Sequence, residues 1–127
     1  MVLPPAVVIH GRAHRVAAYA PGRPVLLLSA PGAACYAGAG WWRALTQGTE
    51  QPAALDCGDQ PGRALEALAV GCPLVILLPC PAWQSVATRT PPGTLLAARP
   101  PALDLQHPGA ARRLDRWLQG DSTALFG

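Results

Sequence analysis

The chain contains no lysine, so arginine carries all of its basic charge. The 127 residues include ten arginines and seven acidic residues, and charged residues make up only 13% of the chain. The arginines are scattered, and only Arg112 and Arg113 are adjacent. Nucleic-acid binding and a polybasic membrane-surface segment both need concentrated basic charge, so we expect neither partner. With abundant Ala, Gly and Pro, the all-arginine set is typical of a GC-rich bacterial genome.

Long hydrophobic runs are also absent. The apolar stretches at 25–28 and 74–78 are far shorter than the ~20 residues that a membrane-spanning helix needs. Residues 1–6 lack the positive start and long apolar run of a signal peptide. We therefore expect a cytoplasmic protein whose thiols stay reduced.

The four cysteines form no C-x-x-C pair and no Cys/His cluster. This excludes the usual structural zinc sites, and we expect no metal. No segment identifies a cofactor. The low charge leaves few charged side chains to cover a small domain, and four tryptophans are present. Because aromatic residues are enriched at interface cores, we expect a homo-oligomer, with a dimer favoured.

Short apolar runs alternate with Ala-rich stretches, which is the pattern of βαβ units. The pattern predicts strands at 6–9, 25–29, 53–57, 74–78 and 94–98. It predicts helices at 12–19, 33–47, between Asp59 and Gly71, and at 81–88, with Asp59 as the N-cap of the third. An amphipathic C-terminal helix is expected at 108–119, followed by a frayed tail at 121–127.

This arrangement predicts a single α/β domain over 1–127. Right-handed crossovers would give a three-layer αβα sandwich around a parallel sheet of about five strands. The strand order, Rossmann-like or flavodoxin-like, stays open. The outline resembles the small Rossmann-like proteins of GC-rich bacteria, and this resemblance of architecture assigns no functional residues.

In such sheets, ligands bind outside the carboxyl ends of the strands. The richest strand end is the stretch from Ser29 to Gly40. Its glycines Gly32, Gly38 and Gly40 fit neither G-x-G-x-x-G nor a P-loop. A glycine-rich turn before a helix can direct N–H groups at an anion, whereas the alternative is that the glycines only permit a turn and close packing. Arg99, at the end of the fifth strand, is a candidate clamp for a carboxylate or phosphate.

A second candidate site contains Cys80, His10 and Asp56. Cys80 follows the fourth strand and opens a helix, where the helix dipole would favour its thiolate. His10 would act as its base, and Asp56 would orient the imidazole. The alternative is a buried, inert cysteine. His14 and His107 belong to no motif, and we interpret both as surface or loop residues.

Three functions remain open at this stage. The first is binding of a small, possibly anionic molecule at the carboxyl edge, with or without catalysis. The second is a cysteine-dependent transferase or hydrolase that uses Cys80 and His10. The third is a non-catalytic homo-oligomeric interaction module, in which Trp41, Trp42 and the C-terminal helix make the contacts.

Overall fold

The apolar runs form one sheet of six short parallel strands in a computed structural model that describes residues 2–126. The strands are β1 (Ala6–Val8), β2 (Leu26–Leu28), β3 (Ala53–Asp56), β4 (Leu74–Ile76), β5 (Leu95–Leu96) and β6 (Ala102–Asp104). Their order across the sheet is β5-β4-β3-β2-β1-β6, and every neighbouring pair is parallel. The α/β class and the parallel sheet are therefore confirmed, with six strands in place of about five.

The helices between the strands occur near the predicted positions. They are α1 (Arg12–Tyr19), α2 (Ala39–Thr46), α3 (Pro61–Ala69), α4 (Trp83–Thr88) and α5 (Ala110–Leu118), with short 3-10 helices η1 (Ala33–Cys35) and η2 (Ser122–Leu125). The continuous helix predicted at 33–47 is interrupted, because Gly38 has a φ of 84°, which an α-helix does not allow. The predicted cap at Asp59 is also wrong. Gln60 is the N-cap of α3, and no side chain caps that end.

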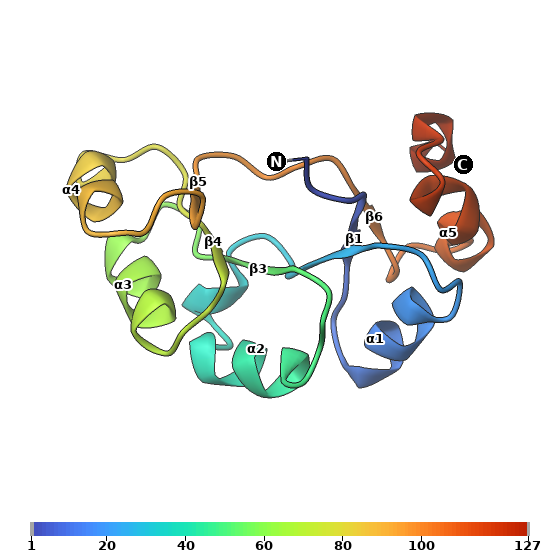
Figure 1. Cartoon of the computed structure of the whole chain (residues 1–127), viewed down its shortest axis with the longest axis horizontal. Helices are drawn as coiled ribbons and strands as arrows, with labels where there is room; N and C mark the ends of the chain where they lie inside the picture. Colours follow the sequence, from blue (N-terminus) through green and yellow to red (C-terminus); the bar gives the residue numbers. More distant parts are fainter. Residues whose placement is uncertain (1, 127) are drawn as a thin grey trace.

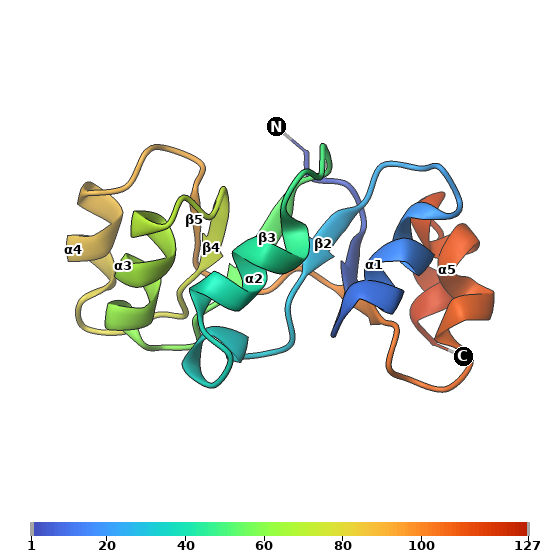
Figure 2. The same ribbon diagram turned by 90° about the horizontal axis from the view of Figure 1, so that it is seen from below.

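The helices α1–α4 lie along one face of the sheet, as Figures 1 and 2 show. This follows from the topology, because β1 to β5 advance across the sheet in one direction and right-handed crossovers then place each helix on the same side. The core on this side is the larger of the two and contains the fully buried Trp42 of α2. Trp42 is therefore not available as an interface contact, whereas Trp41 is only partly buried.

The opposite face of the sheet has a smaller core of strand side chains, among them Val8, Leu28 and Ile76. No helix residue belongs to this cluster; partly buried residues of strands and loops, such as Leu3, pack against it. The N-terminal segment and the connection from β5 to β6 pass over this face in Figure 1. The three layers are thus helices, sheet and extended chain.

The strand β6 was not expected from the sequence. It pairs with β1 in the register Ala6 to Ala102, Val7 to Leu103 and Val8 to Asp104. The chain leaves β5 at one edge of the sheet, crosses it, and adds β6 at the other edge beside β1. The strand order therefore reverses between β1 and β6.

The C-terminal helix α5 flanks the β6 edge of the sheet. Its Trp117 buries the indole ring and donates from Nε1 to the Ala6 carbonyl at 2.7 Å. The following residues, expected to be frayed, form η2, whose Ala124 is fully buried and whose first turn is capped by Asp121. None of the helices within residues 2–126 is long and apolar enough to cross a membrane. The homo-oligomer stays a prediction.

Candidate functional site

The reversal of strand order places the carboxyl ends of β1 and β6 side by side. In open α/β sheets this is the point where a crevice forms, because the connections from the two strands leave in opposite directions. Here the chain continues from β1 into α1 and from β6 toward α5. His10 follows β1, and Asp104 is the last residue of β6.

The two side chains form a close pair. Nε2 of His10 lies 2.8 Å from Oδ1 of Asp104, and the side chains are 26% and 23% exposed. The same carboxylate oxygen accepts a hydrogen bond from the Gln106 backbone N–H at 2.9 Å. The pair is therefore held in position from both strands, and both side chains remain partly exposed to solvent.

The electrostatics keep Asp104 ionised. Partial burial raises the pKa of this carboxyl, but the hydrogen bond from Gln106 and the contact with His10 outweigh it, so the pKa lies below its ordinary value of 3.8. An ionised carboxylate only accepts hydrogen bonds, so Nε2 of His10 carries the proton that it donates to Asp104. In the neutral imidazole, Nδ1 then keeps a lone pair that can accept a proton or a hydrogen bond.

His14 supports the same turn. Its Nδ1 accepts a hydrogen bond from the His10 backbone N–H at 3.0 Å, and the two rings meet edge to face with centroids 5.4 Å apart. The His14 side chain on α1 thus fixes the backbone of His10. Among the described residues, no hydrogen bond occupies Nδ1 of His10.

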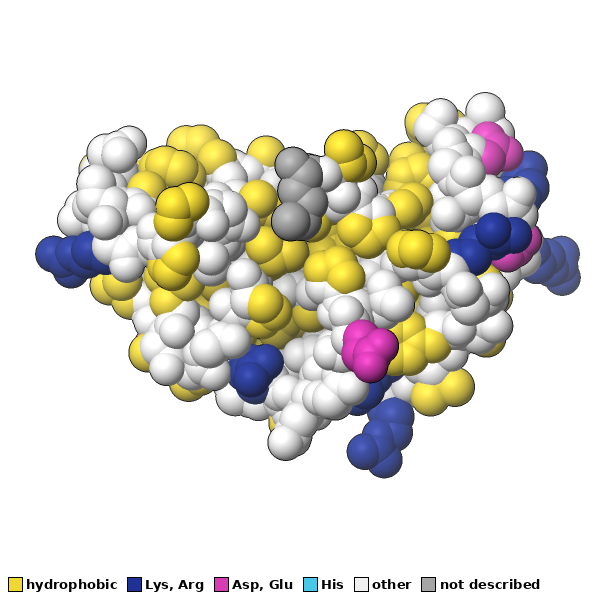
Figure 3. All heavy atoms as spheres, viewed as in Figure 1, with side chains coloured by type: hydrophobic (Ala, Val, Ile, Leu, Met, Phe, Trp, Pro, Cys, Tyr) yellow, Lys and Arg dark blue, Asp and Glu magenta, His cyan; other side chains and the backbone are white. Residues whose placement is uncertain are grey.

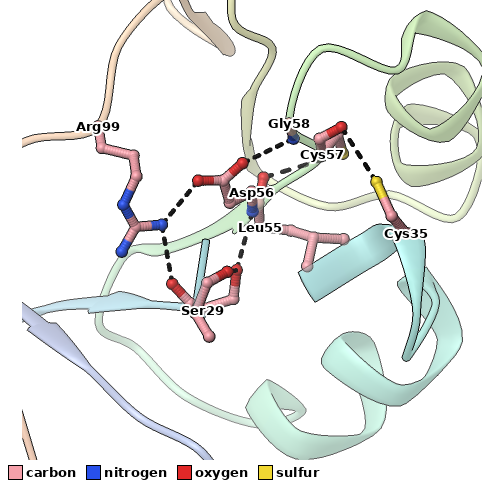
Figure 4. A network of polar contacts seen from close by, with 8 residues as sticks. Ser29, Cys35, Leu55, Asp56, Cys57, Gly58 and Arg99 are labelled. Carbon is pink, nitrogen blue, oxygen red and sulfur yellow. Dashed lines mark hydrogen bonds and ion pairs between the residues drawn. The ribbon is translucent and has the colours of Figure 1, made fainter. Parts of the chain in front are cut away.

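A second network of polar groups lies at the ends of β2 and β3 (Figure 4). Arg99 donates from Nη1 to Oδ2 of Asp56 at 2.7 Å and to the Ser29 carbonyl at 3.0 Å. The Asp56 N–H donates to Ser29 Oγ at 2.9 Å, and Gly58 N–H donates to Asp56 Oδ1 at 2.7 Å. Asp56 is only 1% exposed and Ser29 is fully buried. These polar groups satisfy one another's hydrogen-bonding requirements. Through Arg99 they also attach the β5–β6 connection to the sheet.

The glycines of the stretch from Ser29 to Gly40 have different roles. Gly32 precedes η1 with a φ of 63°, Gly38 precedes α2, and Gly40 lies within α2. Gly58 has a φ of 58°, and a Cβ there would lie 3.9 Å from the Gly32 Cα and 3.8 Å from the Cys35 Sγ. A Cβ at Gly32, Gly38 or Gly40 would meet no atom within 4 Å, so close packing does not explain these three glycines. The positive φ angles of Gly32 and Gly38 do explain glycine at the turns before η1 and α2. An anion site in this stretch stays a prediction.

The predicted group of Cys80, His10 and Asp56 is not brought together. Cys80 follows β4, which lies three strand spacings from β1, so it is separated from His10 by roughly 14 Å across the sheet. Cys80 lines its own hollow of about 340 Å³ with Trp83 and Gln84. It also precedes the N-terminus of α4, which begins at Trp83. Asp56 is engaged by Arg99, and the carboxylate that orients His10 is Asp104.

Sequence reasoning missed Asp104 and His14. The signal for Asp104 is weak, because three residues after Pro100–Pro101 are too few to show a strand pattern. Because no strand is predicted at 102–104, Asp104 is not recognised as a residue at the carboxyl end of a strand. His14 stands four residues after His10, in the first turn of α1, and this spacing is a signal that the sequence offers.

No group of three or more His, Cys, Asp or Glu side chains within residues 2–126 is arranged to hold a metal ion. The chain matches no protein-family model, no curated protein and no solved structure.

Proposed function

We propose that this protein binds a small molecule at the carboxyl ends of β1 and β6, with Nδ1 of His10 as the hydrogen-bond or proton acceptor for the ligand. The observation that carries the proposal is the His10–Asp104 pair at the reversal of strand order. A carboxylate that orients a histidine and stabilises its protonated form is the arrangement that general bases use. The partial exposure of both side chains supports access.

The site suits proton transfer better than covalent chemistry. The cysteine-dependent alternative requires His10 beside a thiol, and Cys80 lies at the end of a strand three positions away. A ligand that offers an acidic N–H or O–H proton to His10 fits the arrangement. The imidazolium formed would then be stabilised by the Asp104 carboxylate at 2.8 Å.

The direct test is a thermal-shift screen against nucleotides, sugars, small acids and phosphates. A ligand present at one hundred times its Kd stabilises the folded state by about 2.7 kcal/mol, which raises the Tm of a chain of this size by about 10 °C. Any ligand found is then titrated by NMR while the His10 imidazole resonances are followed. We expect those resonances to shift upon saturation, because the ligand contacts the ring.

His10→Gln and Asp104→Asn should each weaken binding of that ligand. Arg89→Gln is the control, because Arg89 is exposed and lies at the C-terminal end of α4, on the side of the sheet opposite to β1 and β6 in the strand order. A ligand that stabilises the protein without moving the His10 resonances, and that binds His10→Gln as tightly as the wild type, contradicts the proposed site.

A further inference from the structure

A hollow of about 430 Å³ lies beside α5, away from the His10–Asp104 pair. It is lined by Pro108, Gly109, Arg112, Arg113, Arg116 and Phe126. We propose that this hollow binds a small phosphate ester, with the arginines on the phosphate and Phe126 against an apolar or aromatic part of the ligand. This site goes beyond the proposed function, since neither His10 nor Asp104 lines it.

The charge of the hollow favours an anion. Three arginines line it, and no acidic residue is among its lining residues. Asp121 is a long ion-pair partner of Arg116, with its Oδ2 4.0 Å from Nη1, while its Oδ1 accepts hydrogen bonds from Thr123. Asp115 of the same helix is bonded instead to Arg23 at 2.9 Å. Figure 3 shows several basic side chains at the end of the molecule formed by α5, with acidic side chains beside them.

One of the arginines is held in place before any ligand arrives. Arg113 donates from Nη1 to the Ala124 carbonyl at 3.2 Å and from Nε to the Gly109 carbonyl at 3.4 Å. Arg112 and Arg116 are exposed and stand one helical turn apart, so they can approach the same ligand group. Because Arg113 is already fixed, this set of donors loses less conformational entropy on binding a ligand than a set of freely mobile side chains would.

The chemistry of the donors favours a phosphate over a carboxylate. A phosphate monoester presents three oxygens in tetrahedral directions and nearly two negative charges, whereas a carboxylate presents two coplanar oxygens and one charge. Phe126 is 81% exposed at the margin of the hollow. A ring of the ligand could therefore cover apolar surface that is otherwise left in water.

The size of the hollow indicates a small molecule. Its volume falls within the range of about 300–1,000 Å³ that is usual for small-ligand sites. Three arginines on one helix form a much smaller basic surface than the extended patch that nucleic-acid binding requires.

The test is an NMR titration of the ¹⁵N-labelled chain with phenyl phosphate, inorganic phosphate and benzoate. We expect saturable shifts of the amides at 109–113, with phenyl phosphate binding more tightly than either of the other two. The double variant Arg112→Gln/Arg116→Gln should weaken phenyl phosphate by roughly tenfold or more, because two charge-assisted contacts are lost. Arg89→Gln is the control, since Arg89 is exposed and lies outside the hollow.

Several results would overturn the site. These are an absence of saturable shifts, shifts confined to other parts of the chain, or equal weakening by Arg89→Gln. Benzoate binding as tightly as phenyl phosphate overturns the choice of phosphate, and an unchanged affinity in Phe126→Ala overturns the contact with the ring. Tighter binding of a short single-stranded RNA than of phenyl phosphate overturns the assignment to a small molecule. None of these outcomes depends on His10, so the two sites are tested separately.

Discussion

Replacement of Arg99 by methionine should destabilise this protein more than replacement of its partner Asp56 by asparagine. Asp56 is 1% exposed and Arg99 is 23% exposed, so the two charges differ in their access to water. When Arg99 is removed, the buried carboxylate loses the donor 2.7 Å from Oδ2 and keeps only the Gly58 N–H on Oδ1. When Asp56 becomes neutral, Arg99 can still donate to the Ser29 carbonyl and reach solvent.

The expected magnitudes follow from this asymmetry. Removal of one partner from a buried ion pair typically costs about 3–5 kcal/mol. Because Asp56 retains one backbone donor, we expect Arg99→Met to lower the free energy of unfolding by about 3 kcal/mol, equivalent to about 10 °C in Tm. Asp56→Asn should cost about 1–2 kcal/mol. The double variant Asp56→Asn/Arg99→Met should be more stable than Arg99→Met alone, since the unpaired buried charge is then absent.

The assay is urea unfolding followed by circular dichroism at 222 nm. Arg89→Met is the matched control and should stay within about 0.5 kcal/mol of the wild type, because Arg89 is exposed. If Arg99→Met unfolds at the same urea concentration as the control, the Asp56–Arg99 pair does not hold the β5–β6 connection. If the double variant is less stable than Arg99→Met, the argument from an unpaired buried charge is wrong.

The remaining predictions concern other parts of the fold. Asp104→Asn should lower the free energy of unfolding by about 1 kcal/mol at pH 7. Because the pKa of Asp104 is lowered in the folded state, that difference should be present above pH 3.8 and disappear as the pH falls through the folded value; a difference that persists in acid, measured by urea unfolding, contradicts this. Gly58→Ala should cost about 1–2 kcal/mol, since its φ of 58° strains any residue with a Cβ, whereas Gly40→Ala in α2 should be neutral or stabilising by up to about 1 kcal/mol. Equal thermal stabilities of the two variants would refute that reasoning. Cys35 is exposed and should react at once with a thiol reagent at pH 7, but Cys57 should react only after unfolding, because burial and the nearby Asp56 raise its pKa to about 12. Mass spectrometry of the labelled native protein checks this, and rapid native labelling of Cys57 would show that β3 opens locally.

Much of the candidate edge could be predicted without the structure. The apolar runs at the first four strands are long enough to be recognised, and a parallel sheet collects the residues that follow them at one edge. This rule nominates His10, Ser29 and Asp56, and all three lie at that edge. Arg99 is nominated as well, but which of these side chains pair could not be predicted, because a hydrogen bond between residues 94 positions apart, such as that between His10 and Asp104, leaves no local pattern in the chain.

The sequence by itself determined the α/β class and the positions of α1 and of the first four strands. It also determined that the short apolar runs of these strands form the core. These depend on local periodicity and on Pro and Gly, which act over a few residues. Only the tertiary structure decided the strand order, the placement of β6 beside β1, and the covering of one sheet face by extended chain. It also decided that Asp104 orients His10 while Asp56 binds Arg99, because both pairs depend on which strands become neighbours.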